Sequence, residues 1–223
     1  MTILGDNMHK FSLIITAGGT SSRYGNKNKL LEYIDDKMVI EHSLAPFLQF
    51  DEINQIIVVA NVGILETLKK IFANKNIEII EGGKTRQESV YNGLQCVKNQ
   101  YVIVHDGARP LITSDIIKKV MSRTIEYGAT SVMSKTTDTI KEVDESGRII
   151  RTIDRSKLYN TQTPQAFKTN LIKEAHNKLK DKTFTDDSSM LEELGIPVYI
   201  TEGNYTNIKI TSKCDLDFAK LYI

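Results

Sequence analysis

Asp106 stands directly after an apolar run, in the stretch V-H-D-G-A-R-P at residues 104–110. A carboxylate in this place can bind Mg²⁺, which in proteins takes one or two carboxylates together with phosphate oxygens and water, or it can hold a ribose hydroxyl. Arg109 offers a simpler alternative, in which the two side chains form only a structural ion pair. His105 is interpreted as structural, because a single histidine is poor evidence for a metal site or a general base. Asp106 is therefore a candidate ligand for a metal and a nucleotide.

A stretch rich in glycine and basic side chains occupies residues 16–30, T-A-G-G-T-S-S-R-Y-G-N-K-N-K-L. Small residues let backbone N–H groups approach an anion closely, and an arginine with two lysines can neutralise a triphosphate. The residues concerned are Ala17, Gly18, Gly19, Arg23, Lys27 and Lys29. The stretch is neither a Walker A loop nor a G-x-G-x-x-G motif, and a generic turn with solvated basic residues is the alternative.

A second glycine pair occurs in E-G-G-K-T-R-Q-E-S at residues 81–89. Gly83 frees the backbone before a predicted helix that carries Arg86 and Ser89 on one face. Such a turn can present main-chain amides and a hydroxyl group to the edge of a base. An ordinary strand-to-helix corner explains the motif more simply when it is taken alone.

Several polar groups late in the chain are each typical of turns or helix caps. They are D-T at residues 138–139, D-R at 154–155, T-P-Q at 163–165, T-D-D at 185–187 and N-I-K-I-T at 207–211. Their order along the chain, rather than any one of them, supports a functional interpretation.

Short β-branched runs alternate with amphipathic segments over most of the chain. Strands are predicted at residues 11–16, 56–60, 77–80 and 101–105, and helices at 39–48, 63–73, 86–97 and 114–127, the last capped by Thr113 or Ser114. Continuous Val and Ile runs are typical of strands buried on both faces of a parallel sheet. The pattern predicts a three-layer α/β fold in a single domain of residues 1–223, since one core can still serve this length. The glycine-rich stretch then falls at a carboxyl end of a strand, where such sheets bind ligands.

Residues 137–160 break this alternation and predict a hairpin around a turn at E-S-G, residues 145–147. A hairpin whose faces cannot both be buried in its own domain often packs on a partner, so we expect a protruding β-arm that forms a homodimer. Helices near 168–180 and 188–194, strands at 198–201 and 207–210, and a helix from Ser212 complete the prediction.

The composition excludes several functional classes. The 29 basic residues nearly balance the 28 acidic ones, so there is no charge excess to attract nucleic acid. Cys96 and Cys214 form no C-x-x-C motif and indicate neither a disulfide framework nor a zinc site. No secretory signal is evident, and no apolar run approaches the ~18 residues of a membrane span. We expect a cytoplasmic protein with small-molecule substrates and with no nucleic-acid or membrane partner.

In their order, the motifs resemble those of the 2-C-methyl-D-erythritol 4-phosphate cytidylyltransferases of the non-mevalonate isoprenoid pathway. The matching series is A-G-G-x-x-x-x-R, G-G-x-x-R-x-x-S, H-D-x-A-R-P, D-T-I-K, D-R, T-P-Q, T-D-D and N-I-K-I-T, from Ala17 to Thr211. The resemblance implies a Rossmann-like, GT-A-like nucleotidyltransferase sheet, transfer of CMP from CTP to a polyol phosphate, and Mg²⁺ as cofactor. Lys29 best matches the catalytic lysine of the family, although N-K-L replaces the common P-K-Q and Lys27 is an alternative. Ser21 and Ser22 stand where relatives commonly carry another glycine.

The resemblance also implies a role for each matching residue. Catalytic roles fall to Arg23, Lys29, Lys209 and Arg155. The nucleotide would be bound by Ala17, Gly18, Gly19, Gly83, Arg86, Ser89, Asp106 and Gly107, with Asp106 also holding Mg²⁺. The polyol phosphate would be bound by Thr139, Arg155, Thr163, Thr185, Asp186 and Lys209. Since Thr139 and Arg155 belong to the arm, the partner chain is expected to complete the site.

Two other functions stay open on the sequence. Ribitol-5-phosphate cytidylyltransferases share the nucleotide half, although Gly107-Ala108 and D-R-S-K-L at residues 154–158 resemble the isoprenoid enzyme more. A methyl branch is worth only about 1–3 kcal/mol in a pocket, so the two acceptors are hard to separate. A non-catalytic nucleotide-binding protein is an alternative of another class. Charges converging on an α-phosphate argue against it, because a protein that only binds does not need them.

Overall fold

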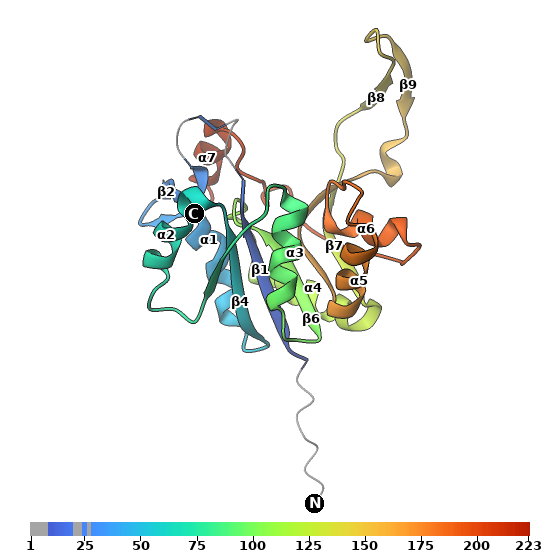
Figure 1. Cartoon of the computed structure of the whole chain (residues 1–223). Helices are drawn as coiled ribbons and strands as arrows, with labels where there is room; N and C mark the ends of the chain where they lie inside the picture. The colour runs from blue at the N-terminus through green and yellow to red at the C-terminus, as the bar shows by residue number, and fades with distance from the viewer. Residues whose placement is uncertain (1–8, 20–23, 26–27) are drawn as a thin grey trace, which may run out of the picture.

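A mixed seven-stranded sheet forms the centre of the molecule (Figure 1). The structure is a computed structural model that describes residues 9–19, 24–25 and 28–223. In spatial order the strands are β11 (Tyr199–Glu202), β7 (Ala129–Lys135), β10 (Tyr159–Lys168), β6 (Tyr101–Asp106), β1 (Phe11–Ala17), β4 (Ile53–Ala60) and β5 (Glu78–Glu81). Only β10 among them is antiparallel to its neighbours.

Helices cover both faces of this sheet. They are α1 (Val39–Leu44), α2 (Val62–Ile71), α3 (Arg86–Cys96), α4 (Ser114–Tyr127), α5 (Thr169–Lys178), α6 (Asp187–Glu193) and α7 (Lys213–Ala219). Because successive strand residues point to opposite faces, Leu13 and Ile15 join a core with α1, α2, α4 and α7, and Ile14 joins a second core with α3, α5 and α6. The predicted three-layer α/β fold is confirmed. No helix in the described part of the chain is both long enough and apolar enough to cross a bilayer.

The two central strands, β1 and β6, bring distant parts of the sequence together. Their parallel register pairs Thr16 with Asp106 at the carboxyl edge of the sheet. The chain leaves β1 through Gly18 and Gly19, and it leaves β6 through Gly107, whose N–H donates to the carbonyl of Thr16 at 3.0 Å. The loops that follow both strands therefore meet at one edge.

The predicted hairpin consists of β8 (Ile140–Val143) and β9 (Ile149–Ile153), and it stands clear of the rest of the molecule in Figure 1. The carboxylate of Asp144 closes its turn by accepting from the N–H groups of Ser146 and Arg148, both at 3.0 Å. Gly147 follows with a φ of +83°, a value that favours glycine. A short 3₁₀ turn, Arg155–Lys157, leads back to β10.

The predicted strand at residues 207–210 is wrong. This segment pairs with no described strand: the N–H of Ile210 donates to the carbonyl of Ala108, and the carbonyl of Asn207 accepts from the Arg109 side chain. The predicted helix at 39–48 ends early as well. It becomes a 3₁₀ turn at Ala45–Gln49, with Pro46 at its start, because proline cannot donate the hydrogen bond that continues an α-helix.

Candidate active site

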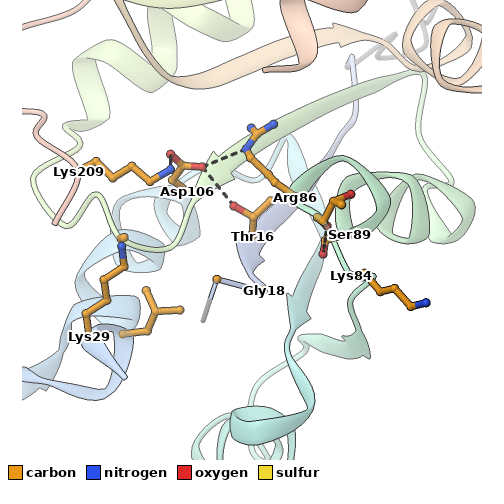
Figure 2. Close-up of a pocket in the computed structure, with 12 residues that line it drawn as sticks. Thr16, Gly18, Lys29, Lys84, Arg86, Ser89, Asp106 and Lys209 are labelled. Atoms are coloured by element: carbon orange, nitrogen blue, oxygen red, sulfur yellow. Dashed lines mark hydrogen bonds and ion pairs between the residues drawn. The ribbon is translucent and has the colours of Figure 1, made fainter. Parts of the chain in front are cut away.

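A pocket of about 280 Å³ opens at the carboxyl edge of the sheet, between the loops after β1, β5 and β6 (Figure 2). Of the residues predicted from sequence, it brings together Gly18, Gly19, Lys29, Arg86, Ser89, Asp106 and Lys209. It adds Thr16, Leu30, Lys84, Thr85 and Ala108, which sequence reasoning did not single out. Residues of both glycine-rich stretches and of the N-I-K-I-T motif therefore line one pocket.

Asp106 is buried and is surrounded by three cationic side chains. Its Oδ2 lies 2.9 Å from Nζ of Lys209 and 3.4 Å from Nε of Arg109, while its Oδ1 lies 3.6 Å from Nε of Arg86. Burial alone would raise the pKa of this carboxyl, but attraction to the cations outweighs burial and lowers the pKa. Asp106 is therefore ionised at neutral pH, and the pocket has positive charge to spare for a polyphosphate.

Hydrogen bonds from both neighbouring strands fix the position of Asp106. The hydroxyl of Thr16 donates to Oδ1 at 3.2 Å, and Thr163 accepts from the Asp106 N–H at 3.0 Å. The ring of His105 lies between Thr163, 3.1 Å from Nδ1, and the carbonyl of Arg109, 3.4 Å from Nε2. A carbonyl only accepts, so Nε2 carries the proton. Burial lowers the pKa of His105 to about 3, which agrees with its predicted structural role.

The glycine-rich loop leaves β1 beside the base of α3. A Cβ atom on Gly18 would come within 2.9 Å of Oγ of Ser89, so only glycine allows this close approach. Ala17 is buried, and the side chain of Asn61 donates to the carbonyl of Gly19 at 3.1 Å. The predicted catalytic residue Arg23, together with Lys27, lies outside the described residues.

Lys29 begins a 3₁₀ turn, Lys29–Leu31, on the wall opposite α3. Asn28 caps this turn, because its side chain accepts from the N–H of Leu30 at 3.0 Å. In Figure 2 the amino end of Lys29 points to the side of the pocket that holds Asp106 and Lys209, whereas Lys84 points away from it. Lys29 therefore lines the same pocket as Asp106 and Lys209, and its contact with phosphate stays a prediction.

The loop before α3 is held by its own side chains. Oγ of Ser89 accepts from the N–H of Gly83 at 3.1 Å and donates to the carbonyl of Thr85 at 2.8 Å. A Cβ atom on Gly83 would clash with Cβ of Glu88, and one on Gly82 would lie 2.8 Å from Oγ of Ser89. The Ser89 hydroxyl thus shapes this loop, and a direct contact between Ser89 and a base stays a prediction.

The structure separates the residues predicted to bind the second substrate. Thr163 and Lys209 both contact Asp106. Asp186 caps α6, accepting from Gln165 at 2.6 Å, and Thr185 beside it is exposed. Thr139 and Arg155 lie exposed on the arm and do not line the pocket of their own chain; Arg155 donates to the carbonyl of Thr137.

Sequence reasoning missed two buried residues that organise the site. Asp187 forms an ion pair with Arg86, with 2.8 Å between its Oδ2 and Nη2 of Arg86. Asn207 donates to the carbonyl of Thr163 at 2.9 Å, and its own carbonyl accepts from Arg109 at 2.7 Å. Both belong to motifs recognised from sequence, T-D-D and N-I-K-I-T. Their sequence context does not indicate burial, because an aspartate near a helix start and an asparagine outside helices and strands are usually exposed.

The donor set suits Mg²⁺ better than a metal held entirely by protein. No group of three His, Cys, Asp or Glu side chains that could hold a metal occurs in the described part of the chain. Asp106 is the carboxylate among the described residues that line the pocket, and Thr16 adds a hydroxyl next to it. Mg²⁺ typically binds one or two carboxylates and takes its remaining ligands from phosphate oxygens and water. A single carboxylate in a pocket that is also lined by Lys29, Arg86 and Lys209 fits that pattern.

Comparisons with known proteins cover almost the whole chain. Residues 11–223 match the model of the family described as IspD, 2-C-methyl-D-erythritol 4-phosphate cytidylyltransferase. A protein of that name from Bacillus cereus is 39% identical over 221 residues, which cover 96% of this chain and 97% of the relative. Another from Alkaliphilus oremlandii is 41% identical over 225 residues, covering 96% of this chain and 95% of the relative.

Solved structures give the same result. The crystal structure of 4-diphosphocytidyl-2C-methyl-D-erythritol synthase from Anaerococcus prevotii superposes with a TM-score of 0.86 at 31% identity, and the match covers 97% of this chain and 99% of that one. The similarity therefore extends over nearly the full length of both chains.

Proposed function

Because the chain belongs to the family of 2-C-methyl-D-erythritol 4-phosphate cytidylyltransferases, we propose that the pocket around Asp106 is where it carries out the reaction of that family. The enzyme transfers CMP from CTP to 2-C-methyl-D-erythritol 4-phosphate, giving 4-diphosphocytidyl-2-C-methyl-D-erythritol and pyrophosphate in non-mevalonate isoprenoid biosynthesis. The observation that supports this placement best is the convergence of Lys29, Lys209 and Arg86 on one pocket with a buried carboxylate.

CTP enters with its phosphates at the loop after β1 and its cytidine at the loop before α3. The small side chains of Ala17, Gly18 and Gly19 let main-chain N–H groups approach the phosphates, and Arg23 adds a positive charge. Gly83, Arg86 and Ser89 face the cytosine, while Asp106 and Gly107 lie beside the ribose. A few fixed polar groups suffice to select a pyrimidine here, because a larger purine base would be excluded by its size.

The reaction is an in-line displacement at the α-phosphorus of CTP. An oxygen of the acceptor phosphate forms the new P–O bond, and the bond to the bridging oxygen of pyrophosphate breaks. A phosphate monoester is largely ionised at neutral pH, since its second pKa is ~6, so no residue has to remove a proton from it. The protein contributes positioning and charge: Lys29 and Arg23 face the charge that develops on the α-phosphate and the leaving group, and Lys209 holds the nucleophile.

Mg²⁺ is the metal that this donor set suits, with Asp106 as its protein ligand. When bound, the ion neutralises phosphate charge and polarises the reacting phosphoryl group. Asp106 must then share its oxygens, because Lys209 lies 2.9 Å from Oδ2. Lys209 is half-exposed and long enough to turn from Asp106 to the acceptor phosphate.

The acceptor lies between Lys209, Thr163 and Asp186 on one side and the arm of a second chain on the other. The arm supports a homodimer, because its apolar side chains Val143, Ile149 and Ile150 are 53%, 59% and 54% exposed in the single chain. Burying such side chains against a partner is favourable. In the dimer, Thr139 and Arg155 of one chain reach the acceptor phosphate bound by the other. We also place the enzyme in the cytoplasm, as expected from its sequence.

Pyrophosphate release tests this function directly. Purified protein is incubated with CTP and Mg²⁺ and with either 2-C-methyl-D-erythritol 4-phosphate or ribitol 5-phosphate. Release with the methylerythritol phosphate alone is the expected result. Preference for ribitol 5-phosphate would contradict the acceptor assignment and leave the nucleotide site in place, whereas binding of CTP without turnover of either acceptor would contradict the catalytic role.

A further inference from the structure

The guanidinium of Arg86 lies between two carboxylates that come from different parts of the fold. On the pocket side its Nε is 3.6 Å from Oδ1 of Asp106, and on the far side its Nη2 is 2.8 Å from Oδ2 of Asp187. Asp187 is 1% exposed and lies away from the pocket lining. One active-site arginine is therefore paired with a carboxylate that no substrate can touch.

Asp187 is itself held rigidly. It is the first residue of α6, and its N–H donates to the side-chain carbonyl of Gln165 at 3.0 Å, while the amide of the same glutamine donates to Asp186 at 2.6 Å. Nε2 of His176 on α5 lies 3.7 Å from its other oxygen, Oδ1. Gln165 of strand β10 thus fixes the backbone at Asp187, and its carboxylate lies between His176 and Arg86.

The two contacts of Arg86 differ in strength. A distance of 2.8 Å is typical of a charge-assisted hydrogen bond, and 3.6 Å is too long for one. Attraction to Asp187 also raises the pKa of Arg86 more than attraction to Asp106 does, against the lowering effect of burial. The guanidinium is therefore drawn toward Asp187 and away from Asp106, and Oδ1 of Asp106 accepts instead from the hydroxyl of Thr16 at 3.2 Å.

We propose that Asp187 is a positioning residue for nucleotide binding: it holds Arg86 at the wall of the pocket and keeps it from closing onto Asp106. Without this carboxylate, Arg86 forms a close ion pair with Asp106, which then is less available to a ribose hydroxyl or a metal ion. Asp187 acts through Arg86 and touches neither substrate. The inference rests on the proposed placement of CTP in this pocket.

A double-mutant cycle on CTP binding tests the proposal. The dissociation constant of CTP is measured by calorimetry for the wild type, Asp187→Asn, Arg86→Gln and the double variant, and KM and kcat are measured alongside. Loss of a buried charged partner weakens CTP binding about tenfold in Asp187→Asn. In the Arg86→Gln background the same change has an effect of less than about twofold, because its target is gone. Glu193→Gln, an exposed carboxylate on the same helix, is the control and keeps wild-type binding.

If Asp187 is purely structural, Asp187→Asn and Arg86→Gln act independently. The dissociation constant of CTP in the double variant then rises by the product of the two single effects. That outcome, or unchanged CTP binding in Asp187→Asn, overturns the proposal. If Asp187→Asn fails to fold, Asp187→Glu decides: it keeps the charge but displaces the guanidinium, so CTP binding weakens in a protein that circular dichroism shows to be folded, and unchanged binding overturns the proposal. If Arg86→Gln alone leaves CTP binding unchanged, the proposed nucleotide site is what fails.

Discussion

The Nζ atom of Lys209 lies 2.9 Å from Oδ2 of Asp106. Lys209 belongs to the segment between β11 and α7, and Asp106 is the last residue of the central strand β6. The C-terminal part of the chain therefore lines the same pocket as the loops that follow β1 and β6. The N–H of Ile210 anchors this segment by donating to the carbonyl of Ala108 at 2.8 Å. The pocket around Asp106 therefore gains Lys209 only when the C-terminal segment is docked.

Replacing Asp106 with Asn leaves three cationic side chains around a neutral amide. We expect turnover to fall by about 100-fold or more, because the charges that orient the substrates lose their common partner, and the free energy of unfolding to fall by about 3 kcal/mol, because Arg109 stays buried. Steady-state kinetics and urea unfolding measure the two effects. Asp115→Asn, which removes an exposed ion pair with Lys119, should change neither.

Adding a methyl group at Gly83 should disturb the loop before α3. Its Cβ atom would clash with Glu88, so the backbone has to shift where cytidine is proposed to bind. Because small displacements of a binding group are costly, we expect KM for CTP to rise about tenfold in Gly83→Ala while KM for the acceptor changes little. Glu66→Ala, at an exposed position on α2, is the control, and equal changes in both KM values would contradict the placement of cytidine.

Lys29→Ala and Arg155→Ala chains should rescue one another if the arm serves the partner's site. A mixed dimer then has one intact site, made of Lys29 from one chain and Arg155 from the other. Random exchange of equal amounts should restore about a quarter of wild-type activity from two variants that are nearly inactive alone. If each arm served its own chain, mixing would restore nothing.

The contribution of Asp187 to stability should depend on pH in a defined direction. Burial would raise the pKa of this carboxyl, but attraction to Arg86 outweighs burial and lowers it. A lowered native pKa means that the stabilisation is fully present above the unfolded value of ~3.9 and is lost as pH falls through the native pKa. Urea unfolding should show Asp187→Asn less stable by about 2 kcal/mol at both pH 7 and pH 5, with the difference shrinking below pH ~3.5. A difference that grows on acidification would contradict the ion pair.

Hydrophobic runs predicted the parts of the fold that are buried on both faces. The segments I-I-V-V-A and Y-V-I-V-H lie in β4 and β6, and α4 begins at Ser114 after the predicted cap Thr113. Strands β7 and β10 escaped prediction because they are polar: Ser131 and Gln165 are fully buried, but they are satisfied by a hydrogen bond to each other. Pro164 in β10 also argued against a strand, because proline cannot donate a hydrogen bond to a neighbouring strand. The register with β7 shifts between Thr161 and Gln165.

The residues of the candidate site were likewise predicted only where the sequence carries a recognisable signal. Residues in glycine-rich turns and at strand ends were found, because Gly18, Asp106 and Lys209 have local signals and a fixed order. The side chains that hold them were not predicted, since the pairing of Asp187 with Arg86 depends on how the fold brings the first residues of α6 and α3 together. Fold-dependent contacts of this kind leave no trace in local sequence. The predicted strand at 207–210 is wrong for a related reason. Its polar–apolar alternation is typical of a strand, but the segment bonds to the loop after β6 and pairs with no strand among the described residues.

The most direct test of the account compares Lys29→Ala with Lys27→Ala in pyrophosphate release from CTP and 2-C-methyl-D-erythritol 4-phosphate. Lys29 lines the pocket with Asp106 and Lys209, so its loss should lower kcat by about 100-fold or more, as expected for one preorganised charge donor. Lys27→Ala should keep near-normal turnover. Near-normal turnover in Lys29→Ala together with loss of activity in Lys27→Ala would contradict the assignment of the catalytic lysine and the position of the triphosphate that depends on it.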